Sequence, residues 1–185
     1  MKPPIRDVVI SESQLKARIK SLAREIEAAF PDQEIVMVSI LKGAFIFLAD
    51  LMREVDRDIE VGFLYLSSYR GEVKPQGDVE EYLIPFPPIR GRAVLLVEDI
   101  FDSGASLAYA YQRCLEQNPS CLRVCVLLEK EMEREADLVP PLDFVGFQIP
   151  DRFVVGYGLD YREKYRQLNE IVVPELTEAD PTQPS

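Results

Sequence analysis

Histidine is absent from this chain of 185 residues. Without it, the chain has no Ser-His or Cys-His nucleophilic system and no metal site with histidine ligands. Any proton transfer must therefore use carboxylates, lysine, tyrosine or cysteine.

Basic residues are in short supply compared with acidic ones. The chain has 21 lysines and arginines against 32 aspartates and glutamates, which gives a net charge of −11. Because affinity for nucleic-acid backbones comes mainly from clustered cations, we expect no nucleic-acid partner. A small anionic substrate is still compatible with this charge, since it needs only a local group of cations.

Cysteines and long apolar runs are also few. Cys114, Cys121 and Cys125 are odd in number and lack the paired CxxC spacing of a zinc site, so we interpret them as buried, reduced thiols. No apolar run approaches the roughly 20 residues that cross a bilayer, and the first residues contain no signal-peptide core. We therefore expect a cytoplasmic protein with no membrane partner.

What the sequence does contain is the composition of a folded globule, with 47% hydrophobic and 29% charged residues. Its length fits one domain, which we place at residues 1–173. The polar, proline-rich residues 174–185 are predicted to form a mobile tail, and residues 68–81, with glycine, proline and charges, a flexible lid.

The hydrophobic pattern predicts alternating strands and helices. Ser11 and Gln14 have the spacing of a capping box, and the apolar residues after them fall on one face of a helix that should end near Pro31. Short apolar runs predict strands at residues 34–40, 60–68, 94–99 and 123–128, with helices after the first and third. This order indicates an α/β fold with a mostly parallel sheet, where ligands bind at the carboxyl ends of the strands.

The strongest functional signal is VLLVEDIFDSGASL, residues 94–107. Glu98 and Asp99 end a strand and can accept hydrogen bonds from two sugar hydroxyls, directly or through Mg²⁺. The free amides of the following helix can bind phosphate, Gly104 permits close approach of the main chain, and Ser103 and Ser106 add hydroxyl donors. A phosphorylated ribose would satisfy both features.

Two other nucleotide motifs are missing from this region. Neither the GxxxxGK of a Walker loop nor the GxGxxG of a Rossmann fold is present, so the cradle suits a monophosphate. The plainer alternative is that Asp102 and Ser103 only cap a helix and that the two acids are solvated charges at a strand end.

The whole string closely resembles the phosphoribosyl pyrophosphate (PRPP) signature of type I phosphoribosyltransferases, and its EDIxDSG form resembles the hypoxanthine(-guanine) branch. The resemblance implies a mostly parallel twisted sheet flanked by helices, with a small hood formed by the N- and C-terminal segments. It also implies Mg²⁺-dependent purine salvage: PRPP and hypoxanthine or guanine would give IMP or GMP and pyrophosphate. It assigns PRPP contacts to Glu98, Asp99, Asp102, Ser103, Gly104, Ala105 and Ser106.

Two further segments carry the resemblance. ILKGAFIFLADL, residues 40–51, is similar to the family's pyrophosphate loop, in which the Leu41-Lys42 peptide would be cis. SSY, residues 67–69, is similar to the start of its catalytic lid. Together with the segment that follows Ile149, they imply pyrophosphate contacts at Leu41, Lys42, Gly43, Ser68, Tyr69 and Arg166.

IPDRFVVGYGLDYREKYRQL, residues 149–168, resembles the family's purine and second-magnesium region. Phe153 would stack on the base and the Val154 backbone would meet its Watson-Crick edge. Lys130, expected just beyond the strand at 123–128, would donate to the exocyclic oxygen of a 6-oxopurine and so reject adenine. The resemblance implies purine contacts at Ile100, Lys130, Phe153, Val154 and Asp160, and metal contacts at Glu98, Asp99 and Asp160.

The chain departs from the family in two places. EKEMERE, residues 129–135, is more acidic than usual, which could alter the purine site or a subunit contact. Pro85, Pro87 and Pro88 make the strand near the lid an unlikely central strand.

Asp102 is our candidate for the group that handles the purine proton, because it lies between the phosphate cradle and the ribose carboxylates. The family resemblance also implies a homodimer or homotetramer. Two alternatives remain: a PRPP-binding regulator with the same fold, and a receiver-like signalling domain, which also begins with a strand like VLLVED.

Overall fold

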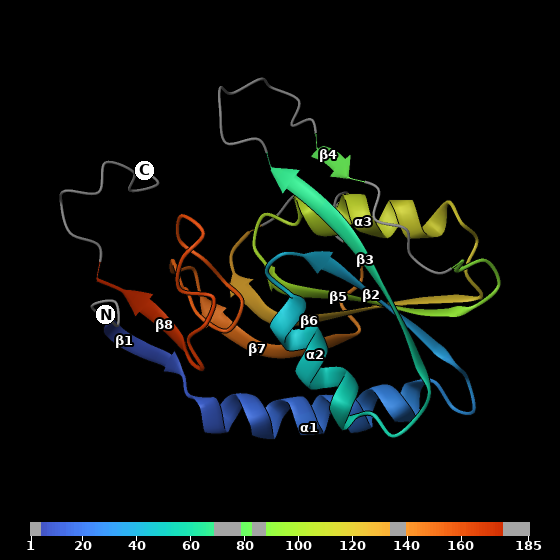
Figure 1. Cartoon of the computed structure of the whole chain (residues 1–185), viewed down its shortest axis with the longest axis horizontal. Helices are drawn as coiled ribbons and strands as arrows, with labels where there is room; N and C mark the ends of the chain where they lie inside the picture. The colour runs from blue at the N-terminus through green and yellow to red at the C-terminus, as the bar shows by residue number, and fades with distance from the viewer. Residues whose placement is uncertain (1–4, 69–78, 83–87, 134–139, 176–185) are drawn as a thin grey trace.

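The computed structural model describes residues 5–68, 79–82, 88–133 and 140–175, which form two sheets and three helices (Figure 1). In chain order the elements are β1 (Ile5–Ile10), α1 (Glu12–Ala29), β2 (Ile35–Leu41), α2 (Phe45–Glu54), β3 (Ile59–Ser68), β4 (Val79–Tyr82), β5 (Ala93–Phe101), α3 (Ala105–Leu115), β6 (Cys121–Glu131), β7 (Phe144–Pro150) and β8 (Ile171–Pro174).

The larger sheet has six strands in the order β4-β3-β2-β5-β6-β7. Strands β3, β2, β5, β6 and β7 are parallel, and β4 pairs antiparallel with β3 at the edge. This confirms both the α/β class and the prediction that the strand near the prolines is not central. Within the described residues, no helix combines the length and apolar character that a membrane crossing requires.

The helices cover both faces of this sheet (Figure 1). Because successive strand residues point to opposite faces, Met37 and Leu95 pack in one core cluster with α1 and α2. Val38 and Leu96 pack in a second cluster with α3. Burial on both faces explains why the predicted strands read as continuous apolar runs.

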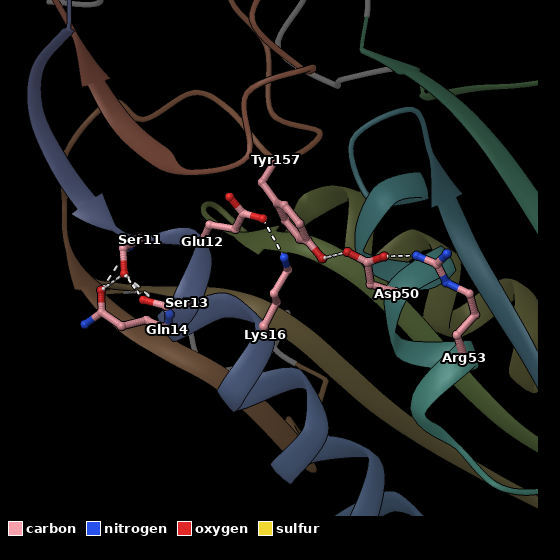
Figure 2. Close-up of polar contacts among 8 residues, drawn as sticks. All are labelled: Ser11, Glu12, Ser13, Gln14, Lys16, Asp50, Arg53 and Tyr157. Atoms are coloured by element: carbon pink, nitrogen blue, oxygen red, sulfur yellow. Dashed lines mark hydrogen bonds and ion pairs between the residues drawn. The ribbon is translucent and has the colours of Figure 1, made fainter.

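Helix α1 begins and ends where the sequence predicts. The Gln14 amide donates to the Ser11 hydroxyl oxygen, and the Ser11 amide donates to the Gln14 side chain, which completes the capping box (Figure 2). Its buried residues lie on one face: Leu15, Ile19, Leu22, Ala23 and Ile26. A cap of this kind contributes about 1 kcal/mol to helix stability.

Strand β6 is longer than predicted and corrects the position of Lys130. Its apolar run stops at Leu128, but its pairing with β7 continues to Glu131, opposite Pro150. Lys130 therefore lies inside the strand, opposite Ile149, and not beyond it.

The smaller sheet joins the two ends of the chain. Strand β1 pairs antiparallel with β8, with Ile5 opposite Pro174, and forms the expected hood beside the carboxyl ends of the central strands (Figure 1). Because β8 includes Pro174, the expected tail cannot begin at that residue. Three sets of residues lie outside the described ones: 176–185, most of the predicted lid with Tyr69, and 134–139, which include the last two residues of the acidic segment.

Candidate active site

A cavity of about 620 Å³ opens at the carboxyl ends of the parallel strands. This is where an open α/β sheet binds its ligands. Five parts of the chain line the cavity: the end of β2 with the residues after it, the last part of β3, the end of β5 with the turn after it, the end of β6, and the loop between β7 and β8.

Most of the predicted site residues meet in this cavity. Those that line it are Leu41, Lys42, Gly43, Asp99, Ile100, Asp102, Lys130, Phe153, Val154, Asp160 and Arg166. The predicted phosphate residues 103–106 follow Asp102 at the start of α3, and Ser68 ends β3. The cavity lining also includes residues that the sequence did not single out: Tyr65, Leu66, Arg152, Leu159, Arg162 and Glu163.

Two buried carboxylates end the apolar part of β5. Glu98 and Asp99 are 7% and 6% exposed, and the Ile100 amide donates to Asp99 Oδ1 at 2.9 Å. Glu98 Oε2 has no hydrogen-bond partner among the described residues. Burial, followed by the neighbouring Asp99 charge, raises the pKa of Glu98 well above its usual value. A buried oxygen of this kind suits a ligand that brings a donor or a cation.

The turn after β5 presents a helix N-terminus. Gly104, at φ 88°, is the N-cap of α3, and as a glycine it has no side chain with which to cap the helix. The burial of Glu98 and Asp99 contradicts the part of the plainer alternative that makes these acids solvated charges. A Cβ at Gly104 would lie 2.9 Å from the Phe101 ring, so a side chain there would crowd the turn as well as strain its backbone. The amides at the start of α3 can bind phosphate.

Lys130 links the turn after β5 to the loop after β7. Its Nζ lies 3.2 Å from Asp102 Oδ1 and 2.9 Å from Asp151 Oδ1, and its side chain is only 11% exposed. Burial lowers the pKa of Lys130, but hydrogen bonds to Asp151 and Asp102 outweigh it and raise the pKa overall. The lysine is thus held as a cation next to an aspartate that lines the cavity.

Phe153 supplies an aromatic surface to the same cavity. The residue is 37% exposed, and its ring meets Tyr161 edge-on at 5.7 Å between centroids, with 79° between the planes. Val154 follows it and is buried. An exposed ring, a backbone edge and the Lys130 ammonium together suit a flat heterocycle with an exocyclic oxygen.

The Leu41-Lys42 peptide is cis, as the family resemblance implies. A Cβ at Gly43 would overlap the Asp99 carboxylate, so only glycine allows this close approach. Lys42 Nζ lies 3.0 Å from Glu163, and Arg166 donates to the Gly158 carbonyl at 2.7 Å. The loop after β2 and the loop after β7 therefore meet at one side of the cavity.

Tyr157 attaches the second of these loops to helix α2. Its hydroxyl donates to Asp50 Oδ2 at 2.5 Å, and Arg53 of α2 also contacts Asp50 (Figure 2). Burial, followed by the Asp50 hydrogen bond, raises the pKa of the Tyr157 hydroxyl. Tyr157 thus stays neutral and donates its hydrogen bond at neutral pH.

The described residues contain no group of three or more acidic or cysteine side chains placed to hold one metal ion. Glu98, Asp99 and Asp160 therefore do not form a single three-carboxylate site. Mg²⁺ is often bound through one or two carboxylates, with water and substrate phosphates as its other ligands. The Glu98-Asp99 pair, with its unpartnered oxygen, fits a site of that kind.

Comparison with known proteins identifies the family. Residues 11–162 match the model of the phosphoribosyl transferase domain, which is more than half of the chain. The chain belongs to the phosphoribosyl transferase family. This membership selects the type I phosphoribosyltransferase fold over the receiver-like alternative.

Individual relatives within this family are similar to this chain over almost its whole length. The chain is 44% identical over 164 residues to a hypoxanthine phosphoribosyltransferase of Salmonella typhimurium, covering 88% of this chain and 91% of the relative. It is 43% identical over 169 residues to a hypoxanthine-guanine phosphoribosyltransferase of Aquifex aeolicus, covering 91% and 94%. A crystal structure of a hypoxanthine-guanine phosphoribosyltransferase from Bacillus anthracis superposes with a TM-score of 0.83 at 41% identity, covering 92% and 99%.

The sequence of this phosphoribosyl transferase also gave no sign of the contacts made by Asp151, Tyr157 and Glu163. All lie in the segment 149–168 that carried the resemblance, but their partners are distant in sequence: Lys130, Asp50 and Lys42. Asp151 directly follows β7, so recognising that strand would have placed it at a carboxyl end.

Proposed function

We propose that this chain is a purine salvage enzyme, a hypoxanthine(-guanine) phosphoribosyltransferase. It joins a 6-oxopurine, hypoxanthine or guanine, to the ribose of PRPP and releases IMP or GMP and pyrophosphate. The observation that carries the proposal is the Lys130-Asp102 pair in the same cavity as the exposed Phe153 ring. The names of the relatives at 43–44% identity support the same substrates.

In this proposal the base binds between the aromatic ring and the cation. Phe153 stacks on the purine, the Val154 backbone meets its Watson-Crick edge, and Ile100 packs against it. The Lys130 ammonium donates to the exocyclic oxygen, whereas the amino group of adenine would leave the lysine unpaired. Asp102, 3.2 Å from Lys130, is placed to take the proton from the imidazole part of the base.

The sugar phosphate and the leaving group occupy the other parts of the cavity. We assign the 5′-phosphate to the amides and hydroxyls of residues 102–106, and the ribose hydroxyls to Glu98 and Asp99. Pyrophosphate would contact the loop 41–43, Ser68, Tyr69 and Arg166. Lys42 and Arg166 supply the positive charge that a polyphosphate requires.

We propose Mg²⁺ as the cofactor. Glu98 and Asp99 would hold one ion beside the ribose, and Asp160 would help to hold a second one near the pyrophosphate. The metal would neutralise charge on the departing pyrophosphate. The buried, unpartnered Glu98 oxygen and the all-oxygen set of side chains are the features that favour this hard cation.

The test is pyrophosphate release from PRPP and Mg²⁺ with hypoxanthine, guanine, xanthine or adenine added in turn. We expect nucleotide from hypoxanthine, guanine or both, and none from adenine. A chain that releases no pyrophosphate with any 6-oxopurine, although it binds PRPP, would instead be the regulatory alternative.

We further propose a homodimer or homotetramer in the cytoplasm. The oligomer rests on the family resemblance, and light scattering of the eluting protein measures it. The location is supported by Cys114, Cys121 and Cys125, all free, as expected where thiols are kept reduced.

A further inference from the structure

Glu163 contacts both cations that we assign to pyrophosphate. Its Oε2 lies 3.0 Å from Lys42 Nζ and 3.3 Å from Arg166 Nη2, and the residue lines the cavity. Asp160 also pairs with Arg166, at 2.9 Å, but it is Glu163 that joins the two loops. A single carboxylate oxygen thus lies between a lysine from the loop after β2 and an arginine from the loop after β7.

The backbone holds Glu163 in this place. The residue has φ 62°, in the left-handed region, and its amide donates to Asp160 Oδ2 at 2.9 Å. A bulky residue rarely adopts this conformation without such support. This loop conformation therefore places the exposed Glu163 side chain beside the two cations.

We propose that Glu163 is a positioning residue that acts as an internal substitute for pyrophosphate. Its carboxylate pairs with Lys42 and Arg166 while the site is empty, and it must yield them when PRPP or pyrophosphate binds. The inference rests on the proposed roles of Lys42 and Arg166 in binding the leaving group. Its consequence is that Glu163 weakens retention of pyrophosphate and so favours product release.

Charge and exposure fit such a replaceable partner. The hydrogen bonds from Lys42 and then Arg166 lower the pKa of Glu163, so the carboxylate is ionised at neutral pH. The Glu163 side chain is 64% exposed and that of Lys42 is 44% exposed. Exposed ion pairs are weak, so a polyphosphate carrying several charges can displace this carboxylate.

The test is the inhibition constant of inorganic pyrophosphate, with Mg²⁺ present, in the Glu163→Gln variant. Removing the charge of Glu163 should lower this constant about 3-fold, because pyrophosphate then no longer competes with that carboxylate for Lys42 and Arg166. A merely structural role would weaken pyrophosphate binding instead. An unchanged or raised constant overturns the proposal.

Glu60→Gln is the matched control. Glu60 is also exposed and pairs with an arginine, Arg92, at 2.8 Å, but it lies near the amino end of β3, away from the cavity. Both variants change the net charge by one unit. An equal drop in the inhibition constant in both would show a general charge effect and would overturn the role of Glu163.

Two further measurements separate this inference from the proposed function. Calorimetric titration with magnesium pyrophosphate, without PRPP or base, should show the same tighter binding to Glu163→Gln and needs no turnover. In a Lys42→Met background the gain from Glu163→Gln should shrink, and an undiminished gain would contradict the mechanism. Failure of the wild-type chain to form nucleotide would remove the proposed function, whereas normal turnover with unaltered pyrophosphate binding in Glu163→Gln would remove only the inference.

Discussion

At the scale of single residues, Asp102 lies where the proposed function requires a proton acceptor for the purine. It lines the cavity, its side chain is 52% exposed, and its Oδ1 lies 3.2 Å from the Lys130 ammonium. Asp102→Asn keeps an oxygen for that ammonium but removes the basic carboxylate. We expect turnover to fall about 100-fold or more, with the affinity for PRPP nearly unchanged.

Steady-state kinetics and PRPP titration of Asp102→Asn measure this prediction. Asp151→Asn is its control, because Asp151 also pairs with Lys130, at 2.9 Å, without lining the cavity. Near-normal turnover in Asp102→Asn, or an equal loss in both variants, would remove Asp102 from the proton-transfer role.

Glu98 illustrates how a binding site lowers stability. Burial and the Asp99 charge raise its pKa, so the folded chain holds this proton more tightly than the unfolded chain does. The stability that this proton contributes is fully present below the ordinary carboxyl pKa of 4.5. It is lost as pH rises through the raised pKa of the folded chain. Glu98→Gln keeps the neutral shape and should melt about 3 °C higher than the wild type at pH 7, without ligands.

Melting curves of the two proteins between pH 4 and 8 measure the Glu98 effect. The difference should be small near pH 4 and should grow as pH rises. The same variant should lose activity, because it lacks the carboxylate that we propose as a ligand of the ribose and the metal. A difference independent of pH would show that ionisation of Glu98 is not its cause.

At the scale of elements, the Tyr157-Asp50 bond attaches the loop that carries Phe153 and Arg166 to helix α2 (Figure 2). Tyr157→Phe removes the bond and leaves Asp50 with Arg53. We expect a loss of about 1 kcal/mol in unfolding free energy and higher KM values for both PRPP and base. Urea unfolding and kinetics measure the two effects.

Arg53→Ala is the comparison for Tyr157→Phe. Its side chain is 73% exposed and pairs with the same carboxylate, so its removal should cost less than about 0.5 kcal/mol. If Tyr157→Phe behaved like Arg53→Ala, Asp50 would not fix the loop. The raised pKa of Tyr157 also predicts how this stabilisation depends on pH. It should be fully present below about pH 10 and should decline at higher pH, because the tyrosine of the unfolded chain then ionises before that of the folded chain.

Elements with strong local signals were predictable, and elements that depend on distant pairing were not. The capping box and apolar face gave α1, and continuous apolar runs gave β2 and β5, since both signals lie within the element itself. Strand β1 is mostly exposed and is formed by pairing with β8 at the other end of the chain, which no local pattern reveals. The resemblance alone implied that hood.

In the candidate site, too, features specified by local motifs were predictable and contacts between distant segments were not. The cis Leu41-Lys42 peptide and the gathering of Lys42, Asp102 and Phe153 were expected, because continuous motifs specify them. The partnership of Glu163 with Lys42 was not, since 121 residues separate the two and only the meeting of two loops joins them. The predicted strand also ended too early, at Leu128 instead of Glu131, because pairing with β7 extends β6 past its apolar run and includes Lys130.

At the scale of the whole molecule, the charge of the cavity differs from the charge of the chain. The chain carries 21 basic and 32 acidic residues, whereas the cavity lining has five basic and four acidic ones. The basic ones are Lys42, Lys130, Arg152, Arg162 and Arg166. The net negative charge of the molecule therefore repels an approaching PRPP anion, whereas the cations of the cavity attract it. Salt screens both interactions, so it strengthens PRPP binding through the first and weakens it through the second.

The direction in which the KM for PRPP changes with salt shows whether the repulsion or the attraction prevails. At 0.1 M salt the screening length is about 10 Å, so the distant net charge is already largely screened and the contacts inside the cavity are less so. We expect the KM for PRPP to rise about 3-fold between 50 and 300 mM NaCl at fixed Mg²⁺, because added salt then weakens mainly the local attraction. The KM for hypoxanthine, an uncharged substrate, is the internal control and should stay constant. A KM for PRPP that falls with salt would mean that the repulsion by the acidic surface governs binding, and that the cations of the cavity are neutralised by their own acidic neighbours, Glu163 among them.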